Sequence, residues 1–490
     1  MKKTLTVIIL IIALALSLFA CDAVENLNMA AKDDGIREDA TSDMPSGGGG
    51  SGSDMGYSGK SGIRYDSAVD GIRESAYDIA TGKTTADGDV ATTDEGDVTN
   101  GEEPEIPTPR AGLLTACAYD DHEFAAYWQG LLTSNQDGDG VFAEYFAKYD
   151  FNPFYQITVT IADVAGAKVS LMHGDTLLGK AVTNNAGVAY LFAPSRMSDL
   201  EVVVDAPNFD TVVKKPVENN AVSFTKEEVG KETTVFDRIQ LMFVIDTTGS
   251  MSDEIYYLKE EIDDVIGRIK QQTNAEVLLS ILVYRDYGDE YLTDYSDFTS
   301  NVSAQQAYLK KQDADGGGDF PEAVEVAMAE AVDKQWSANA TKIIIHVADA
   351  PAHDQNGYGF DANEPDRSQD VNKWCKAAEK AAEKGIRIIS VASSGIDKMT
   401  EYCFRSQSLL TGGVYIWLTD DSGIGGAHLE GTVEKRPEVE PLNDCIVRVV
   451  AALHSGEKEI TKFPAEQPAE GEEPQEQQAE QGQQQPDPAE

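Results

Sequence analysis

Between about residues 237 and 456, short apolar runs alternate with amphipathic stretches. The continuous apolar run at 241–245 is typical of a strand that is buried on both faces of a sheet, and so are the apolar runs at 277–283 and 343–347, which only Ser280 and His346 interrupt. In the stretch 255–269, apolar residues recur at helical spacing. The pattern predicts an α/β domain with a doubly wound, mainly parallel sheet. Further strands are expected at 386–391 and 414–418, and helices at 321–332, 371–384 and 446–453.

Residues 153–228 have a different period. Ile157, Val159 and Ile161 alternate with polar or small residues, and Asn-Gly-type turn residues separate such runs. This pattern predicts a small β-sandwich. The preceding segment 109–152 has the composition of folded protein, but its pattern assigns no particular element to it.

The two flanks are low in large apolar residues. Residues 22–108 are rich in Gly, Ser, Asp and Thr, and they cannot offset the entropy cost of ordering, so we expect a disordered tether. Residues 457–490 should form a tail that is acidic, because no basic residue follows Lys462, and disordered, because it consists mainly of Glu, Gln, Pro, Ala and Gly. The tail is either a solvated appendage or an internal source of carboxylates for a metal site.

The N-terminus has the layout of an export signal. Lys2 and Lys3 precede an apolar run at 7–16 that is too short to span a membrane comfortably, and Ala20 comes directly before Cys21. The pattern resembles a bacterial lipobox, in which the cysteine is lipidated. We therefore expect residues 1–21 to be a lipoprotein signal peptide and the protein to be extracytoplasmic and lipid-anchored to a bacterial membrane. The alternative is a plain cleaved signal peptide with an incidental cysteine.

Charge and cysteine content narrow the function. The chain has 39 basic and 85 acidic residues, a formal net charge of −46, which argues against nucleic-acid binding. Cys117, Cys375, Cys403 and Cys445 can oxidise in an exported protein, and four cysteines allow three pairings. Their wide spacing fits no zinc pattern.

The string Asp246-Thr247-Thr248-Gly249-Ser250 stands where a buried strand turns into a helix. Asp246, Thr248 and Ser250 supply oxygen atoms at alternate positions. Asp349 follows the strand at 343–347, and ligands of open α/β sheets bind beyond the carboxyl ends of the strands where the winding reverses. If the two strands are neighbours, Asp246 faces Asp349. An all-oxygen site of this kind suits Mg²⁺, with Mn²⁺ or Ca²⁺ as alternatives.

These residues resemble the metal-ion-dependent adhesion site of the von Willebrand factor type A domain, which carries Asp-x-Ser-x-Ser, a loop Thr and a later Asp. Here Thr248 keeps the hydroxyl of the first Ser. The loop 316–322 has no Thr and resembles a bacterial and hemicentin-like branch with an acidic loop. The resemblance implies Asp319 as a metal ligand and Glu322 as a second candidate. The segment 166–187 is similar to carboxypeptidase-regulatory-like and Ig-like domains.

The family resemblance implies metal-dependent capture of a protein partner that supplies an acidic residue, by an adhesion or scaffold protein that is not an enzyme. One alternative is an envelope assembly or signalling subunit that uses the site internally. Another is a hydrolase with Ser250, His353 and Asp349. His353 is too close to Asp349 in sequence to bridge easily to Ser250, and no nucleophile elbow is present. We expect His353 to lie near the metal ligands, as a further ligand or behind them, and His346 to be packed in the core.

Overall fold

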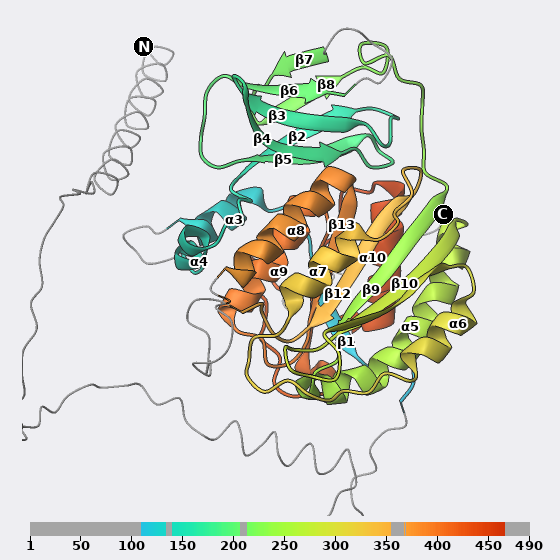
Figure 1. Cartoon of the computed structure of the whole chain (residues 1–490). Coiled ribbons are helices and arrows are strands. Elements are labelled where there is room, and N and C mark those ends of the chain that lie inside the picture. The colour runs from blue at the N-terminus through green and yellow to red at the C-terminus, as the bar shows by residue number, and fades with distance from the viewer. Residues whose placement is uncertain (1–108, 134–139, 206–212, 354–366, 368, 466–490) are drawn as a thin grey trace, which may run out of the picture. The chain divides into compact units, whose positions relative to one another are not determined.

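The computed structural model describes residues 109–133, 140–205, 213–353, 367 and 369–465 (Figure 1). The expected signal peptide, Cys21, the tether and the tail from residue 466 onward lie outside the described residues. In the part that is described, no helix is long and apolar enough to cross a membrane.

An eight-stranded sheet forms the centre of the larger domain, in the order β11-β10-β9-β12-β13-β14-β1-β15. Its strands are β1 (Thr115–Tyr119), β9 (Arg238–Asp246), β10 (Glu276–Tyr284), β11 (Thr293–Thr299), β12 (Thr341–Ala348), β13 (Ile386–Ala392), β14 (Tyr415–Leu418) and β15 (Glu440–Pro441). The strands from β10 to β14 in this order are parallel, and β11 and β1 pair antiparallel with their neighbours. The predicted mainly parallel α/β sheet is confirmed.

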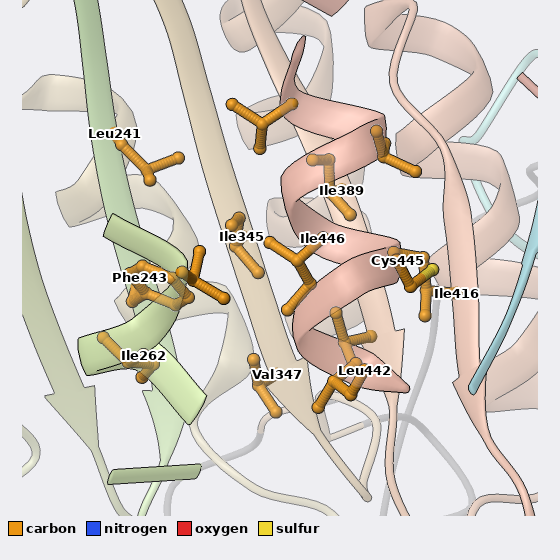
Figure 2. Packing of buried hydrophobic residues seen from close by; sticks show 14 of the residues in the cluster. Leu241, Phe243, Ile262, Ile345, Val347, Ile389, Ile416, Leu442, Cys445 and Ile446 are labelled. Carbon is orange, nitrogen blue, oxygen red and sulfur yellow. The ribbon is translucent and has the colours of Figure 1, made fainter. Parts of the chain in front are cut away.

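Helices cover both faces of this sheet, as a doubly wound fold requires. One face packs against α5 (Ser252–Thr273), α6 (Val302–Leu309) and α10 (Leu442–Ser455), and the other against α7 (Val324–Asp333), α8 (Asp370–Lys384) and α9 (Lys398–Thr411). Figure 2 shows Ile446 of α10 between Ile345 and Ile389 of the sheet, all within one buried cluster. Apolar residues on both faces explain why the central strands read as nearly continuous apolar runs.

The segment 109–152 proves to be part of the same domain, so the domain predicted to begin at residue 237 lacks its first elements. Strand β1 pairs antiparallel with β14, and α3 (Ala125–Leu132) and α4 (Ala143–Lys148) follow it. Trp128 and Phe142 are buried in the core shared by α8 and α9. A five-residue strand is too short for periodicity alone to distinguish it from a helical segment.

The beginning of the expected disordered tail is also ordered. Ile460 is buried in the core, and its carbonyl oxygen accepts a hydrogen bond from Arg448 Nη1 at 2.6 Å. The backbone N–H of Thr461 donates to Glu123 Oε1 at 3.0 Å. One apolar side chain and these hydrogen bonds hold residues 457–465, which the bulk composition did not reveal.

Residues 153–228 form the predicted β-sandwich, inserted between β1 and β9. Its two sheets have the orders β5-β2-β8 and β4-β3-β6-β7 and share one apolar core. The strands are β2 (Tyr155–Ile161), β3 (Lys168–His173), β4 (Thr176–Val182), β5 (Val188–Ala193), β6 (Leu200–Val204), β7 (Val213–Pro216) and β8 (Ala221–Phe224).

The sandwich contacts the larger domain at the amino-terminal ends of the parallel strands. Arg387, near the start of β13, donates through Nη2 to the carbonyl of Val182 at 3.2 Å and through Nη1 to that of Thr411 at 2.9 Å. Thr411 ends α9, where the helix dipole favours a cation. Asn185 Nδ2 donates to the His454 carbonyl at 2.7 Å. These contacts leave the opposite, carboxyl-terminal edge of the sheet to the loops that follow the strands.

The four cysteines are all buried free thiols, so none of the three conceivable pairings forms. Burial raises the pKa of the Cys117 thiol to about 12. Each cysteine acts as a small apolar core residue.

Arg405 joins the segment 109–152 to α9. Its guanidinium is fully buried, and Nε donates to Asp121 Oδ2 at 3.0 Å, while Nη1 lies 3.4 Å from Glu401 Oε1. Replacing one member of a buried ionic group leaves uncompensated charge in the core. We expect Arg405→Met to lower the free energy of unfolding by about 3–5 kcal/mol.

Urea denaturation of the wild-type protein and of Arg405→Met measures this loss of unfolding free energy. The control is Lys376→Met, which removes the ion pair of Lys376 with Glu379, whose side chains are 62% and 47% exposed; it should cost less than about 1 kcal/mol. Equal losses in both variants would show that Arg405 does not hold the two segments together.

Candidate functional site

The carboxyl ends of β9 and β12 bring the two predicted aspartates to one edge of the sheet. The two strands are parallel neighbours, with Ile245 paired to Val347, and β10 lies on the other side of β9. Asp246 ends β9, and Asp349 follows β12. The winding therefore reverses at β9, and the prediction that these strands are neighbours across the reversal is confirmed.

Asp246 is fully buried and is oriented by the loop that follows it. Its Oδ1 accepts hydrogen bonds from Thr248 N at 2.9 Å and Thr248 Oγ1 at 2.7 Å. The other oxygen, Oδ2, is buried and has no hydrogen-bond partner. Thr248 Oγ1 lies 3.4 Å from the Oγ of Ser250, an exposed residue, so a row of oxygens leads from the core to the surface. Burial raises the pKa of Asp246 to about 6, although the hydrogen bonds from Thr248 oppose the shift.

The acidic loop lies directly against this turn. Asp315 N donates to the Thr247 carbonyl at 3.1 Å, and Gly249 N donates to the Gly316 carbonyl at 3.2 Å. Gly317 has a positive φ of 78°, and a Cβ there would lie 3.1 Å from Glu322 Oε1 and 3.4 Å from Thr248 Cβ. Glycine suits this position because the positive φ would strain any other residue, and a Cβ would fit only tightly against Glu322 and Thr248.

Of the two acidic residues predicted in this loop, Glu322 is the more buried. It is 3% exposed, its backbone N–H donates to the Pro351 carbonyl at 2.9 Å, and its Oε2 has no hydrogen-bond partner. Burial, followed by the charges of Asp246, Asp286 and Asp349, raises the pKa of Glu322 far above its ordinary range. Asp319 is only partly buried and stays a predicted ligand.

His353 is buried at the site, but its Nε2 lies 2.8 Å from Asp286 Oδ1, so it does not hydrogen-bond Ser250 through this atom. Although burial lowers the pKa of His353, the hydrogen bond and charge of Asp286 raise it more. Asp289 Oδ2 in turn accepts from Asp286 N at 3.0 Å and Gly317 N at 2.9 Å. His353 thus helps to hold the carboxylates in place.

Sequence reasoning did not place three nearby acidic residues in the metal site. Asp286 follows the end of β10, so the rule that placed Asp349 would have found it. Asp289 and Glu254 had no such signal. Glu254 is fully buried in the first turn of α5, where its Oε1 accepts from Ser394 N at 3.0 Å, and burial raises its pKa, as does the charge of Asp349.

His346 is packed in the core, as predicted. It is fully buried, with Tyr284 Oη 3.2 Å from Nε2 and Gln407 Nε2 3.0 Å from Nδ1. Burial lowers the pKa of His346 to about 3, so the ring is neutral.

The donor set fits a hard divalent cation. Like charges crowd around Asp246 in a place with little solvent, and a cation would relieve both their repulsion and the unmet hydrogen-bonding capacity of Asp246 Oδ2 and Glu322 Oε2. Within the described residues, no three Asp, Glu, His or Cys side chains converge closely enough to hold an ion by themselves. The Thr248 and Ser250 hydroxyls and water therefore have to complete the coordination, as is usual for Mg²⁺.

Comparison with known proteins agrees with the α/β fold of the larger domain. Residues 240–360 match the family model of the von Willebrand factor A domain. Over 184 residues the chain is 26% identical to a putative ariadne-like RING finger protein R811 of Acanthamoeba polyphaga mimivirus, and over 118 residues it is 30% identical to the alpha-protein kinase vwkA of Dictyostelium discoideum. These matches cover 37% and 24% of this chain, and only 18% and 19% of the two relatives.

Among solved structures, an aerotolerance-related membrane protein from Bacteroides fragilis matches 38% of this chain and 92% of its own, with 14% identity and a TM-score of 0.26. The matched family model identifies the larger domain: the chain contains a von Willebrand factor A domain. A domain of this class implies protein–protein binding.

The two acidic residues of the loop can be separated by mutation. We expect Glu322→Gln to weaken Mg²⁺ binding by about tenfold or more, as found when a metal site loses a supporting group. Asp319→Asn should change the Mg²⁺ affinity by less than about threefold, because the charge of a partly exposed residue contributes little binding free energy. Isothermal titration with Mg²⁺ measures both. The reverse order of effects would assign the ligand to Asp319.

Proposed function

We propose that the protein captures a carboxylate-bearing protein partner through a divalent cation, Mg²⁺ in the first place, held at the end of β9. The observation that carries this proposal is the buried Oδ2 of Asp246, which has no hydrogen-bond partner although further carboxylates lie around it. An ionised carboxylate buried in that position costs free energy unless a cation offsets its charge.

The residues that would hold the ion are Asp246, Thr248, Ser250 and Asp349, with Glu322 or Asp319 from the acidic loop. When bound, the cation supplies a Lewis-acidic position that a partner's carboxylate can fill. Thr248 fixes the Asp246 carboxylate through two hydrogen bonds, and Ser250 lies at the surface, where a partner can approach. His353 and Asp289 hold Asp286 from behind.

Binding without turnover is the activity that we propose. A hydrolase built on Ser250, His353 and Asp349 needs the imidazole to take the proton of Ser250. The Nε2 of His353 instead lies at hydrogen-bond distance from Asp286. This contact supports a structural role for His353.

We further propose that the protein works outside the cytoplasm, anchored to a bacterial membrane through Cys21. The apolar run at 7–16 and the Ala20-Cys21 pair support this location. The β-sandwich, which resembles carboxypeptidase-regulatory-like and Ig-like domains, would then act as a spacer. It contacts the end of the sheet opposite Asp246, so it does not cover the metal-binding edge.

The metal site is tested by Asp246→Ala. We expect this variant to lose Mg²⁺ binding in calorimetric titration and to capture no partner from envelope extract, whereas the wild-type protein captures it in Mg²⁺ and releases it in chelator. Asp313→Ala, which removes an acid whose side chain is 86% exposed, is the matched control and should behave as wild type. Partner capture that survives both chelation and the Asp246 substitution would refute the proposal.

The anchor is tested by Cys21→Ser. This variant has no thiol to lipidate, so we expect it to stay unprocessed or to appear in the soluble fraction after cell fractionation. A processed form that still fractionates with membranes would exclude the lipobox interpretation.

A further inference from the structure

A polar pocket opens among the loops that follow β14, at the same edge of the sheet as Asp246 and Asp349. It has a volume of about 320 Å³ and is lined by Thr419, Asp420, Asp421, His428, Glu430 and Arg436. His428 connects it with the metal site, since its Nε2 lies 3.8 Å from Oε1 of the buried Glu254, whose pKa the Asp349 charge raises. Three carboxylates against one guanidinium make the pocket acidic.

His428 lines this pocket and is held in place by hydrogen bonds to Asp420. Its side chain is 3% exposed, its Nδ1 lies 2.8 Å from Asp420 Oδ1, and its backbone N–H donates to the same oxygen at 3.0 Å. The Nε2 of His428 is buried and has no hydrogen-bond partner. These two hydrogen bonds lower the pKa of Asp420, so its carboxylate, 69% exposed, is held ionised and in one orientation.

Arg436 shows which chemistry the pocket accepts. Its Nε donates to Glu430 Oε1 at 2.9 Å and its Nη2 to Asp421 Oδ2 at 3.1 Å. The three side chains are between 47% and 51% exposed. Exposed ion pairs contribute little free energy, so an incoming cation can replace Arg436 at small cost. Among the described residues, Asp420 pairs with His428 and forms no ion pair with a lysine or arginine.

We propose that this pocket is a subsite for a lysine or arginine side chain of the same protein partner that offers its carboxylate to the metal site. The inference rests on the proposed function and names the partner's chemistry. A bare acidic segment approaching an acidic edge is repelled, whereas a basic side chain beside the carboxylate contributes a favourable charge-assisted hydrogen bond at Asp420. Residues 466–490 of this chain include no basic residue and therefore lack this second group.

The test uses synthetic probes on the full chain in Mg²⁺. Each probe is an acetylated peptide amide with one aspartate and one arginine, separated by glycine spacers of increasing length. A matched series carries citrulline, the neutral isostere of arginine. At the spacer length that spans the two sites, we expect the arginine peptide to bind about tenfold more tightly than its citrulline match, the size of one charge-assisted hydrogen bond.

Two variants locate the effect. Asp420→Asn should remove most of the arginine preference without changing Mg²⁺ affinity, and Arg436→Gln should increase it, because Asp421 and Glu430 then have no internal cation. Asp313→Asn removes the same charge outside the pocket and should leave the preference intact. A loss of preference that is equal in Asp313→Asn and Asp420→Asn would show a general field effect and overturn the subsite.

The same peptides distinguish a wrong metal-dependent function from a wrong subsite. If no peptide of either series depends on Mg²⁺, the proposed metal-dependent function is wrong. If the aspartate peptides bind in Mg²⁺ and are released by chelator, but arginine and citrulline bind equally at every spacer length, the metal site stands and the subsite is wrong.

Discussion

The structure depends most on how it accommodates a carboxylate buried at the end of a strand. Asp246 has one oxygen held by Thr248 and the other without a hydrogen-bond partner, and burial, together with the charge of Asp286, adds to the cost of ionising it. No single hydrogen bond can offset so much like charge in a desolvated place. A divalent cation can, and the surrounding loops have the oxygen donors and the close packing to hold one.

The rest of the fold presents this edge. Residues on both sides of the inserted β-sandwich build one sheet, and the buried contact between Arg405 and Asp121 joins the early segment to α9. The sandwich contacts the opposite end of the sheet through Arg387 and Asn185. The loops that carry Asp246, Asp349 and His428 are therefore left at one end, where a protein partner can reach them.

The sequence predicted the central sheet well because strands buried on both faces read as nearly continuous apolar runs, as 241–245 does. It did not predict α9, whose buried residues include Arg405, Ser406 and Gln407, since polar residues buried in a core give no apolar period. The apolar pattern did not predict strand β1, because the strand is short and lies far in sequence from its partner β14.

The same contrast holds at the candidate site. Asp246 and Asp349 could be paired from the sequence because a topological rule links strand ends. Glu322 could be named only as an alternative to Asp319, since the choice depends on how the loop folds around Gly317. Asp289 and His428 gave no signal, because their roles arise from contacts between loops that are distant in sequence.

The proposal depends on Asp246 and Asp349, with the hydroxyls of Thr248 and Ser250, being the residues that would hold a divalent cation. Mn²⁺ prefers the same oxygen ligands as Mg²⁺ and scatters X-rays anomalously. A crystal of the full chain grown with Mn²⁺ should show one strong anomalous peak at this strand edge, within about 2.0–2.3 Å of an oxygen of Asp246 or Asp349 and of the Thr248 and Ser250 hydroxyls. No peak at that position in a crystal with an intact Asp246 loop would contradict the account.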